Sequence, residues 1–446
     1  MLKSVLRCFV PESVIGAYHY CLARAAAFLY GHPSEKLVVI GVTGTNGKST
    51  TVQFIGRLLE HAGHRVGWTT TASFKVAERE WVNDKKMTML GRFQTQKLLR
   101  EMVSAGCRYA VIETSSQGIA QSRHIGINYD VAVFTNLTPE HIEAHGGFEN
   151  YKAAKLKLFE GLGRLPRKTI NDTVIEKSIV VNLQDPHAES FLACGADRYS
   201  GFAVGEAGTL ATRLNTTPMT ATDVNFTGSC TTFTVGETTY HLKPAGRFYL
   251  ENALAAMATV KVLGVSPEVM RHGVESLDSV PGRLERIDEG QPFTVIVDYA
   301  YEPAALTAVY DTLKLVQHKR LIHILGSAGG GRDVARREIL GRLAAAHDDI
   351  VIVTNEDPYD EDPESIIDEV ANAARAAGKQ EGVNLFKILD RGKAIQFAVD
   401  LAVPHDLVLI TGKGSEPIMA VAGGKKIPWD DRVAARKALH ALYGGS

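Results

Sequence analysis

Short apolar runs alternate with longer amphipathic stretches through the first half of the chain. Four runs have the length of strands buried on both faces of a sheet: residues 38–40, 109–112, 131–134 and 179–181. Helical periodicity separates them, in residues 50–60, 94–103 and 150–162. Alternation of this kind predicts an α/β unit built on a parallel sheet with helices on both faces.

The pattern changes at residue 209 and then repeats. Residues 209–242 are rich in threonine, alternate in polarity and contain several glycines, which predicts a small antiparallel section. A helical pattern over 250–263 closes the first unit. A second strand–helix series has apolar runs at 294–297, 321–325, 350–353 and 407–410. Helical patterns surround them, at 303–314, 334–346, 363–377, 391–402 and 431–442.

These patterns predict three regions. Residues 1–36 form an N-terminal helical segment, 37–281 a central parallel-sheet domain with its antiparallel section, and 282–446 a Rossmann-like α/β C-terminal domain. The apolar stretch 13–30 raises the question of a membrane span. His19 and Arg24 interrupt it, and it lacks an uninterrupted apolar run of about 18 residues or more. It also lacks a small-residue cleavage site, so we interpret it as a packed or interfacial helix rather than a targeting segment.

Composition narrows the class of protein. The 446 residues are 45% hydrophobic and 22% charged, with a formal net charge of −1, as in a globular enzyme of two or three domains. This balance gives no general attraction for nucleic acid or for an anionic membrane surface. The five cysteines are scattered without metal-binding or redox spacing, which favours a reducing cytoplasm. We expect a cytoplasmic protein that is a monomer or a weak oligomer and acts on small molecules.

The segment "LVVIGVTGTNGKSTT" (37–51) has the order strand, glycine-containing loop and helix. Gly44 and Gly47 let the backbone approach a phosphate closely, and the helix start adds its N–H groups. Lys48 can reach β- and γ-phosphates, and the Ser49 hydroxyl can bind Mg²⁺. Val42 replaces the glycine of the commoner phosphate loop, so an incidental glycine turn is the alternative. No guanine-reading sequence follows, which weakly disfavours a GTPase.

The stretch "TGTNGKSTT" (43–51) resembles the ATP loop of the Mur ligase family. Seven further motifs follow in that family's order: "ETSSQG" (113–118), "TNLTPEHIEAHGGFENYKAAK" (135–155), "GRFYLENALAA" (246–256), "PGRLE" (281–285), "VDYAYEP" (297–303), "GGGRD" (329–333) and "GKGSE" (412–416). The resemblance covers residues 37 to 440. It implies an ATP-dependent amide ligase in which ATP phosphorylates a carboxylate and an amine then displaces phosphate.

The resemblance also implies site residues for ATP and Mg²⁺. The ATP-binding set is Gly44, Thr45, Asn46, Gly47, Lys48, Ser49 and Thr50, with Asn252 near the adenine, Arg283 at the interdomain site and Asp298 on the ribose side. Two Mg²⁺ ions are implied, with ligands from Ser49, Glu113, His141 and a carbamylated Lys155. Lys48, Glu113, His141 and Lys155 form the implied catalytic set. His145 is expected to shape the loop that carries His141.

Substrate residues implied by the resemblance are Thr88, Ser115, Arg123, Arg332, Glu356, Asp357 and Glu416. Arg332 and Lys393 are further expected to contribute positive charge from the C-terminal domain. Members that add meso-diaminopimelate usually carry Asp-Asn-Pro-Arg where this chain has "EDPY" (356–359). Glu356, Asp357 and Asp360 would suit an ammonium-bearing side chain. This favours a diamino acid such as lysine or a diaminopimelate-like amine.

Other departures concern the acceptor. Only about 36 residues precede the first strand, where cell-wall ligases usually have a UDP-binding domain. Tyr249, Tyr301 and Glu302 replace an asparagine and a His-Thr pair of the family, and "TML" (88–90) replaces Thr-Thr-Pro. The leading hypothesis is a ligase that extends a muramoyl-peptide cell-wall precursor. The alternatives are a folylpolyglutamate-synthetase-like or other poly-amino-acid ligase on an acceptor without UDP, and a nucleotide-binding subunit of a complex.

Overall fold

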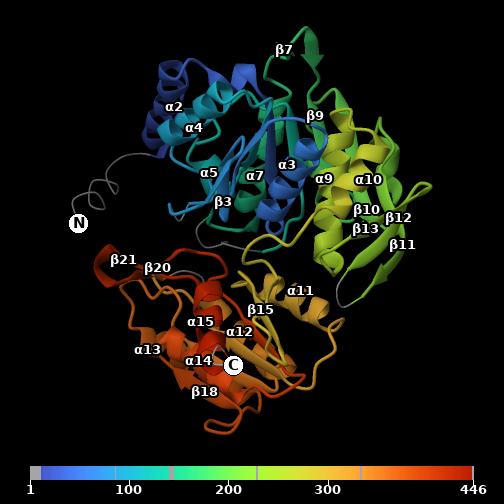
Figure 1. The fold of residues 1–446 in the computed structure, drawn as a ribbon. Helices are drawn as coiled ribbons and strands as arrows, with labels where there is room; N and C mark the ends of the chain where they lie inside the picture. The colour runs from blue at the N-terminus through green and yellow to red at the C-terminus, as the bar shows by residue number, and fades with distance from the viewer. Residues whose placement is uncertain (1–11, 86, 140–144, 228–229, 332–333, 444–446) are drawn as a thin grey trace.

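The chain folds around two separate sheets, seen one above the other in Figure 1. The computed structural model describes residues 12–85, 87–139, 145–227, 230–331 and 334–443. The larger unit contains a sheet of 11 strands and the smaller unit a sheet of 6 strands. The larger unit lies N-terminal in the chain and the smaller unit follows it, as the colour gradient shows. The α/β class and its two sheet-based parts confirm the expected fold.

The larger sheet is parallel in its middle and antiparallel at both ends. Its strand order is β13-β12-β11-β10-β9-β6-β1-β5-β2-β3-β4, with seven parallel-paired strands from β11 to β2. These seven strands are β1 (Val38–Thr43), β2 (Val66–Thr69), β5 (Tyr109–Glu113), β6 (Val131–Phe134), β9 (Ser178–Asn182), β10 (Arg198–Val204) and β11 (Met219–Phe226). The antiparallel ends are β3 (Ser73–Val76) with β4 (Arg79–Val82), and β12 (Thr231–Val235) with β13 (Thr238–Leu242).

Two features of this sheet differ from the sequence pattern. The antiparallel section at 209–242 extends the main sheet, because β11 pairs in parallel with β10. The hairpin β3–β4 was not expected, since its strands have only four residues each and β4 is largely exposed. A small separate hairpin pairs β7 (Lys168–Ile170) with β8 (Thr173–Ile175).

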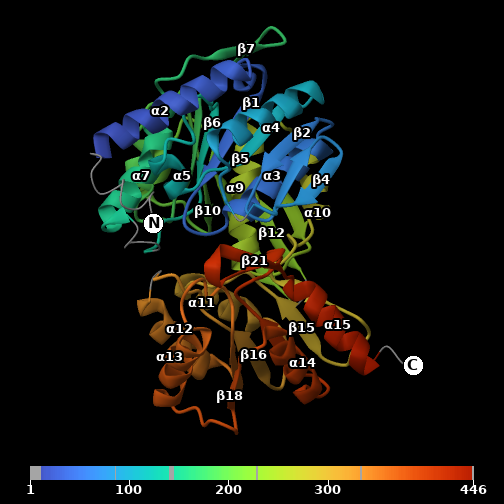
Figure 2. The same cartoon turned by 90° about the vertical axis from the view of Figure 1, so that its left-hand side faces the viewer.

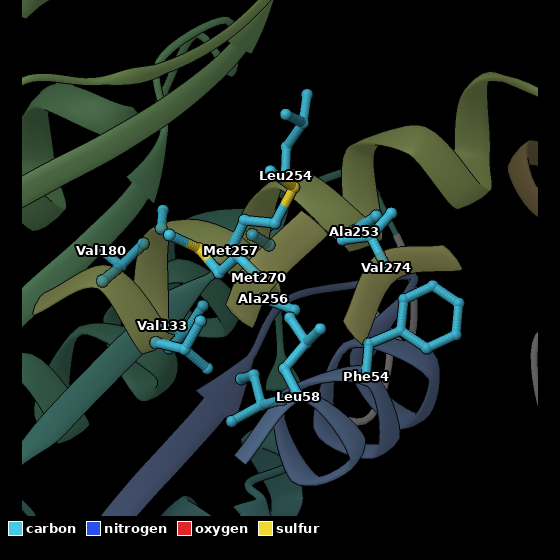
Figure 3. Close-up of a cluster of buried hydrophobic side chains, with 14 of the residues drawn as sticks. Phe54, Leu58, Val133, Val180, Ala253, Leu254, Ala256, Met257, Met270 and Val274 are labelled. Carbon is cyan, nitrogen blue, oxygen red and sulfur yellow. The ribbon is translucent and has the colours of Figure 1, made fainter. Parts of the chain in front are cut away.

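Helices cover both faces of the larger sheet. Three pack on one face: α3 (Lys48–His61), α9 (Arg247–Val262) and α10 (Pro267–Glu275). Their contacts include Phe54 and Leu58, which meet α9, α10 and strand residues Val133 and Val180 (Figure 3). A fully buried side chain of this size stabilises the fold by roughly 1.5–3 kcal/mol. The other helices of this unit are α4 (Arg92–Ser104), α5 (Ser116–Ala120), α7 (Phe148–Leu162) and α8 (Ala188–Leu192).

The smaller sheet has the strand order β14-β15-β19-β16-β17-β18 and is parallel except for β14. Its strands are β14 (Glu285–Ile287), β15 (Thr294–Val297), β16 (Leu321–Leu325), β17 (Ile350–Thr354), β18 (Leu385–Ile388) and β19 (Leu407–Ile410). Its helices are α11 (Pro303–Leu313), α12 (Ala335–His347), α13 (Pro363–Ala376), α14 (Arg391–Leu401) and α15 (Asp431–Tyr443). The hairpin of β20 (Ile418–Val421) and β21 (Lys425–Pro428) extends toward the larger unit (Figure 2).

Before the first strand, α2 (Glu12–Leu29) packs against α4. Ala23, Ala26 and Ala27 are buried there, whereas Phe28 remains 78% exposed. A single 3-10 turn, η1 (Pro33–Lys36), leads into β1. Among the described residues, no helix has the length and apolar character needed to cross a bilayer.

Candidate active site

The loop between β1 and α3 is held from behind by the segment that follows β6. The Thr45 N–H donates to the Asn136 carbonyl (2.8 Å) and the Asn46 N–H to the Asn136 side chain (2.9 Å). Thr135 Oγ1 donates to the Asn46 carbonyl (2.7 Å). Gly47 has a φ of 81°, which favours glycine, and precedes the free N–H groups of the first turn of α3. The loop is therefore preformed, with a helix N-terminus open to an anion.

Lys48 and Ser49 both have partners inside the loop region. Lys48 Nζ donates to the Thr45 carbonyl (2.6 Å), and Ser49 Oγ donates to Glu113 Oε2 (2.7 Å). Glu113 is the last residue of β5, is 2% exposed, and also accepts from the Thr71 N–H (2.7 Å) and hydroxyl (3.1 Å). Ser49 and Glu113 are both expected to bind Mg²⁺, which requires that the two side chains lie close together. The structure places them within hydrogen-bond distance of each other.

A hydroxyl and a carboxylate oxygen at this position fit Mg²⁺. Mg²⁺ binds oxygen ligands and commonly takes one or two protein carboxylates, with waters and substrate phosphates completing its shell. Within the described part of the chain, no group of three or more His, Cys, Asp and Glu side chains is arranged to hold a metal. A magnesium ion at Ser49 and Glu113 would thus depend on phosphate oxygens and water. The expected ligand His141 lies outside the described residues.

Lys155 lies beside the loop, on α7. Its side chain is buried at 1% exposure, its Nζ donates to the Gly44 carbonyl (2.7 Å), and its ammonium lies 4.4 Å from the Tyr151 ring centre. The Tyr151 hydroxyl in turn contacts Thr45 Oγ1 at 3.1 Å. A helix lysine is ordinarily solvated, so its burial against the phosphate loop distinguishes Lys155 from exposed Lys157 on the same helix.

The expected acceptor residues Thr88 and Ser115 line the same pocket as the loop. Thr88 Oγ1 accepts from Thr71 Oγ1 (3.1 Å), and Ser115 Oγ caps α5 by accepting from the Gly118 N–H (3.2 Å). Arg123 differs, because its guanidinium donates to the Gln121 side chain (2.6 Å) and to the Met89 carbonyl. Burial lowers the pKa of Arg123. Arg123 therefore holds the 87–90 segment in place.

His145 and His124 differ in their surroundings. His145 Nε2 lies 3.1 Å from Ser116 Oγ, next to Ser115. Burial lowers the pKa of His124 to about 4, with Lys157 as a smaller cause. The Nδ1 atom of His124 has no hydrogen-bond partner among the described residues. The larger unit thus keeps this buried ring neutral.

The smaller unit closes the pocket opposite the loop. Arg283 lines the pocket, and its guanidinium lies 4.3 Å from the Tyr299 ring centre. Asp298 accepts from the N–H groups of Leu284 and Ala300, each at 2.6 Å, and burial raises the pKa of the Asp298 carboxyl while Arg283 opposes the rise. The apolar part of this wall consists of Leu284, Ala305, Ala308 and Val309, and Phe248 of helix α9 in the larger unit adjoins it. An adenosine nucleotide bound at the loop could place its base against this wall.

Two of the expected residues, Asn252 and Lys393, are not among the residues that line this pocket. Asn252 lies behind the loop: it accepts from Thr51 Oγ1 (3.1 Å), and a side chain at Gly47 would collide with its amide oxygen. Its position supports the loop and does not line the pocket. Lys393 lies at the start of α14, in a different hollow with Asn355, Met419 and Trp429. The expected contribution of Lys393 to the charge of the site stays a prediction.

Acidic side chains gather around one buried lysine in the smaller unit. Lys413 Nζ donates to Asp357 Oδ2 (3.0 Å) and to Glu416, and the Tyr299 hydroxyl donates to Glu416 Oε1 (2.9 Å). The adjacent Glu356 is 4% exposed, and its Oε2 has no hydrogen-bond partner in the described chain. Burial raises the pKa of Glu356, and Arg336 opposes the rise. Arg332, also expected here, lies outside the described residues.

Several residues of the site were not singled out from sequence. Lys413 stands between two glycines directly after β19, inside the "GKGSE" motif, and this placement could have identified it. Arg336 is buried and pairs with Glu302 at 2.6 Å, but 34 residues separate the two. Thr71 follows the short strand β2, which had no clear sequence signal. Long-range pairs of this kind are set by the tertiary fold.

The architecture defines a class before any comparison with known proteins. A phosphate loop with a serine–carboxylate pair faces a second α/β unit that carries buried acidic groups, as expected for an ATP-dependent ligase. The chain belongs to the Mur ligase family: residues 42–260 match the Mur ligase middle domain, and residues 282–414 match the domain described as Mur ligase, glutamate ligase domain. The protein is therefore an ATP-dependent acid–amino-acid ligase, and members of its family use ATP and Mg²⁺.

Named relatives agree with this assignment. The chain is 39% identical over 447 residues to the UDP-N-acetylmuramyl-tripeptide synthetase of Roseiflexus sp. (strain RS-1), covering 98% of this chain and 85% of the relative. It is 34% identical over 434 residues to the UDP-N-acetylmuramoyl-L-alanyl-D-glutamate--2,6-diaminopimelate ligase of Geobacillus kaustophilus (strain HTA426), covering 96% and 84%.

Solved structures have the same fold. One of a UDP-N-acetylmuramoyl-L-alanyl-D-glutamate--2,6-diaminopimelate ligase has 28% identity and a TM-score of 0.58, covering 91% of this chain and 79% of its own. Mycobacterium tuberculosis folylpolyglutamate synthase complexed with ADP and AMPPCP has a TM-score of 0.66 at 19% identity and covers 95% of both chains, a likeness that shows the fold alone.

Proposed function

We propose that the protein, acting in the cytoplasm, joins a diamino acid to the carboxylate of a muramoyl-peptide-type acceptor at the expense of ATP. The observation that carries this proposal is the position of Tyr299. Its ring forms part of the phosphate-loop pocket, and its hydroxyl donates to Glu416 in the acidic cluster. The activated acyl group and the incoming amine would therefore meet along one continuous wall.

The reaction has two balanced steps. An acceptor carboxylate oxygen bonds to the γ-phosphorus of ATP, the bond to the β–γ bridging oxygen breaks, and ADP leaves. The amine nitrogen then bonds to the acyl carbon, the bond to the phosphate oxygen breaks, and phosphate leaves while the nitrogen loses a proton. Lys48 and the N-terminus of α3 would hold the phosphates against electrostatic repulsion. Mg²⁺ held by Ser49 and Glu113 would screen the charge that builds up on them.

We further propose a second Mg²⁺ whose ligands include His141 and a carbamylated Lys155. The support is the position of Lys155, buried at the loop and lining the same pocket as Glu113. Addition of CO₂ to the neutral amine, with loss of a proton, would convert a cationic side chain into an oxygen-bearing anion. Such an anion is a ligand of the kind that Mg²⁺ prefers.

For the amine we propose a side-chain ammonium bound by Glu356, Asp357 and Glu416. Asp357 and Glu416 both accept from Lys413, and the nearby Glu356 keeps one oxygen without a hydrogen-bond partner among the described residues, although Arg336 and Arg391 lie within electrostatic reach of it. A buried carboxylate without a partner is costly, so a bound cation would relieve it. Residue 359 is tyrosine, so the arginine that some family members have at this position is absent here.

An assay of acceptors and amines tests the proposal. Purified protein is given ATP and Mg²⁺ with UDP-N-acetylmuramoyl-L-alanyl-D-glutamate or with folate, each combined with lysine, meso-diaminopimelate, glutamate or alanine. ADP release and product mass are measured. We expect ADP and an amide product with the muramoyl acceptor and a diamino acid. A preference for glutamate or alanine would overturn the amine assignment, and turnover of folate with glutamate would favour the folylpolyglutamate-type alternative.

A further inference from the structure

A groove runs along the larger unit between the β3–β4 hairpin and α4, here called the hairpin groove. It consists of two adjoining hollows that share Arg79, Lys97 and Glu101. One end is bordered by Lys85 and Leu90, and the other by Tyr30, at the end of α2, and Arg100. Strand β4 and helix α4 lie on the same side of the larger unit (Figure 2).

The walls of the hairpin groove carry an excess of positive charge. Arg79 lies 4.4 Å from the Trp81 ring centre and pairs with Glu101 at 3.1 Å. Lys85 pairs with its neighbour Asp84. Lys97 and Arg100 make no hydrogen bond or ion pair within the part of the chain that the structure describes. Glu101 is the sole acid among the described lining residues, so the groove favours an anionic ligand.

The floor of the hairpin groove is apolar. Phe74, Leu90 and Leu98 lie beneath the basic side chains and are nearly buried. Trp81 adds an aromatic wall, partly covered by Arg79. An anion with a flat or apolar portion would fit both surfaces, since an aromatic floor contributes contact area and the guanidinium and ammonium groups bind phosphate oxygens.

One short segment separates the hairpin groove from the phosphate-loop pocket. Thr88 lines the pocket, while Lys85 and Leu90 line the groove. The Asn83 amide fixes this segment by donating to the carbonyls of Thr70 (2.8 Å) and Met87 (3.0 Å). An elongated acceptor with its carboxylate at Glu113 and Lys155 could therefore extend over residues 87–90 into the groove.

We propose that the hairpin groove binds the distal diphosphate of the acceptor, with Lys97 and Arg100 as its main contacts. The inference rests on the proposed function. The end of the acceptor that is remote from the reacting carboxylate would bind between α4 and the β3–β4 hairpin. The bound group is recognised by its negative charge and by the flat ring of the nucleoside beside it.

The test compares two acceptors that differ only in this group, UDP-N-acetylmuramoyl-L-alanyl-D-glutamate and N-acetylmuramoyl-L-alanyl-D-glutamate. We expect the wild type to prefer the first by about tenfold or more in kcat/KM, since charge-assisted contacts to phosphate are strong. The double variant Lys97→Glu/Arg100→Glu should lose that preference, and Lys97→Gln/Arg100→Gln should lose part of it. Lys437→Glu is the matched control, an exposed lysine on α15 with the same change of charge, and should keep the preference.

Each result is decisive. An unchanged preference in both double variants would overturn the inference while the proposed function stands. If the wild type turns over neither acceptor, the proposed function fails. The groove is then tested separately by UDP binding, measured as a change in tryptophan fluorescence to which Trp81 contributes. Binding that is weakened about tenfold in Lys97→Glu/Arg100→Glu and unchanged in Lys437→Glu would support the groove. If UDP does not bind to the wild type, the inference that the hairpin groove binds the diphosphate is overturned.

Discussion

The two walls of the active-site pocket hold their polar groups in different ways. On the phosphate side, Lys48, Ser49, Glu113 and Lys155 all have hydrogen-bond partners within one unit. On the amine side, Lys413 pairs with Asp357 and Glu416, whereas one Glu356 oxygen has no hydrogen-bond partner among the described residues. A preformed loop binds a common ligand with little rearrangement beyond the release of Lys48 from the Thr45 carbonyl, whereas a site with an unpartnered buried oxygen needs its ligand to complete it. The first wall would suit the phosphates shared by ATP-using ligases, and under the proposed function the second would suit one particular amine.

The largest expected effect is at the phosphate wall. Lys48→Ala should lower kcat by about a thousandfold or more, because no other group of the loop carries a positive charge to the phosphates. The melting temperature should stay close to that of the wild type, since among the described residues the Lys48 ammonium hydrogen-bonds only the Thr45 carbonyl. Steady-state ADP release measures kcat, and thermal denaturation measures the melting temperature. Lys437→Ala serves as control, and undiminished turnover by Lys48→Ala would contradict the role of the loop.

Removal of the Lys155 side chain should lower kcat nearly as much as removal of Lys48. Rescue by a small carboxylate can show whether the lysine acts as a carbamate. Lys155→Ala should lose about a hundredfold in kcat, and added acetate or formate should restore part of the activity if a carbamate normally supplies the oxygen ligand. Lys157→Ala, on the same helix but exposed, should behave as the wild type. Activity of Lys155→Ala that acetate does not raise would argue that the lysine acts through its contact with the Gly44 carbonyl.

At the amine wall, activity and stability should change in opposite directions. Glu356→Gln should raise the KM for the diamino acid by about tenfold, because a charged contact to the ammonium is lost. Burial raises the folded-state pKa of Glu356 above its unfolded value, so the ionised carboxylate destabilises the fold at pH values above the unfolded pKa. Glu356→Gln should therefore be as stable as the wild type or more so at neutral pH. Urea unfolding at pH 7 measures this, with exposed Glu338→Gln as control.

The smallest effect at neutral pH concerns His124, which follows Arg123 in the chain. Its folded pKa of about 4 lies below the ordinary value of 6.5. The unfolded chain therefore binds the proton first, and stability falls as pH decreases from about 6.5 to 4, by up to about 3 kcal/mol. His124→Gln should flatten this part of the pH–stability curve, measured by denaturant titrations at several pH values. An equal slope in the variant would assign the loss to other groups.

The difference between the walls also explains what sequence could predict. The β1 strand, the loop and α3 follow one another directly, so their geometry is local and the roles of Gly47, Lys48 and Ser49 could be placed in advance. The parallel core of both sheets was predictable for a similar reason, because runs such as 131–134 and 407–410 are continuously apolar.

Features that depend on distant partners were missed. Hairpin β3–β4 was not expected, since β4 is a short edge strand whose residues Arg79 and Glu80 are exposed. Lys393 lines a different hollow from the phosphate loop, a position that its charge in the sequence could not predict. Lys413 pairs with Asp357 across 56 residues and Arg336 with Glu302 across 34 residues, and no local pattern links the members of either pair. The site roles transferred from the family remain predictions until the variants above are measured.

The bond from Lys48 to the Thr45 carbonyl has a consequence for the departure of spent nucleotide. An arriving triphosphate has to compete with the loop's own oxygen for the ammonium, and its terminal phosphate can do so. After the γ-phosphate has been transferred, ADP has fewer phosphate oxygens that can accept from Lys48, and the lysine would again donate to the Thr45 carbonyl. The Thr45 carbonyl would thus compete with ADP for the Lys48 ammonium, and this competition would favour the release of ADP before the next cycle.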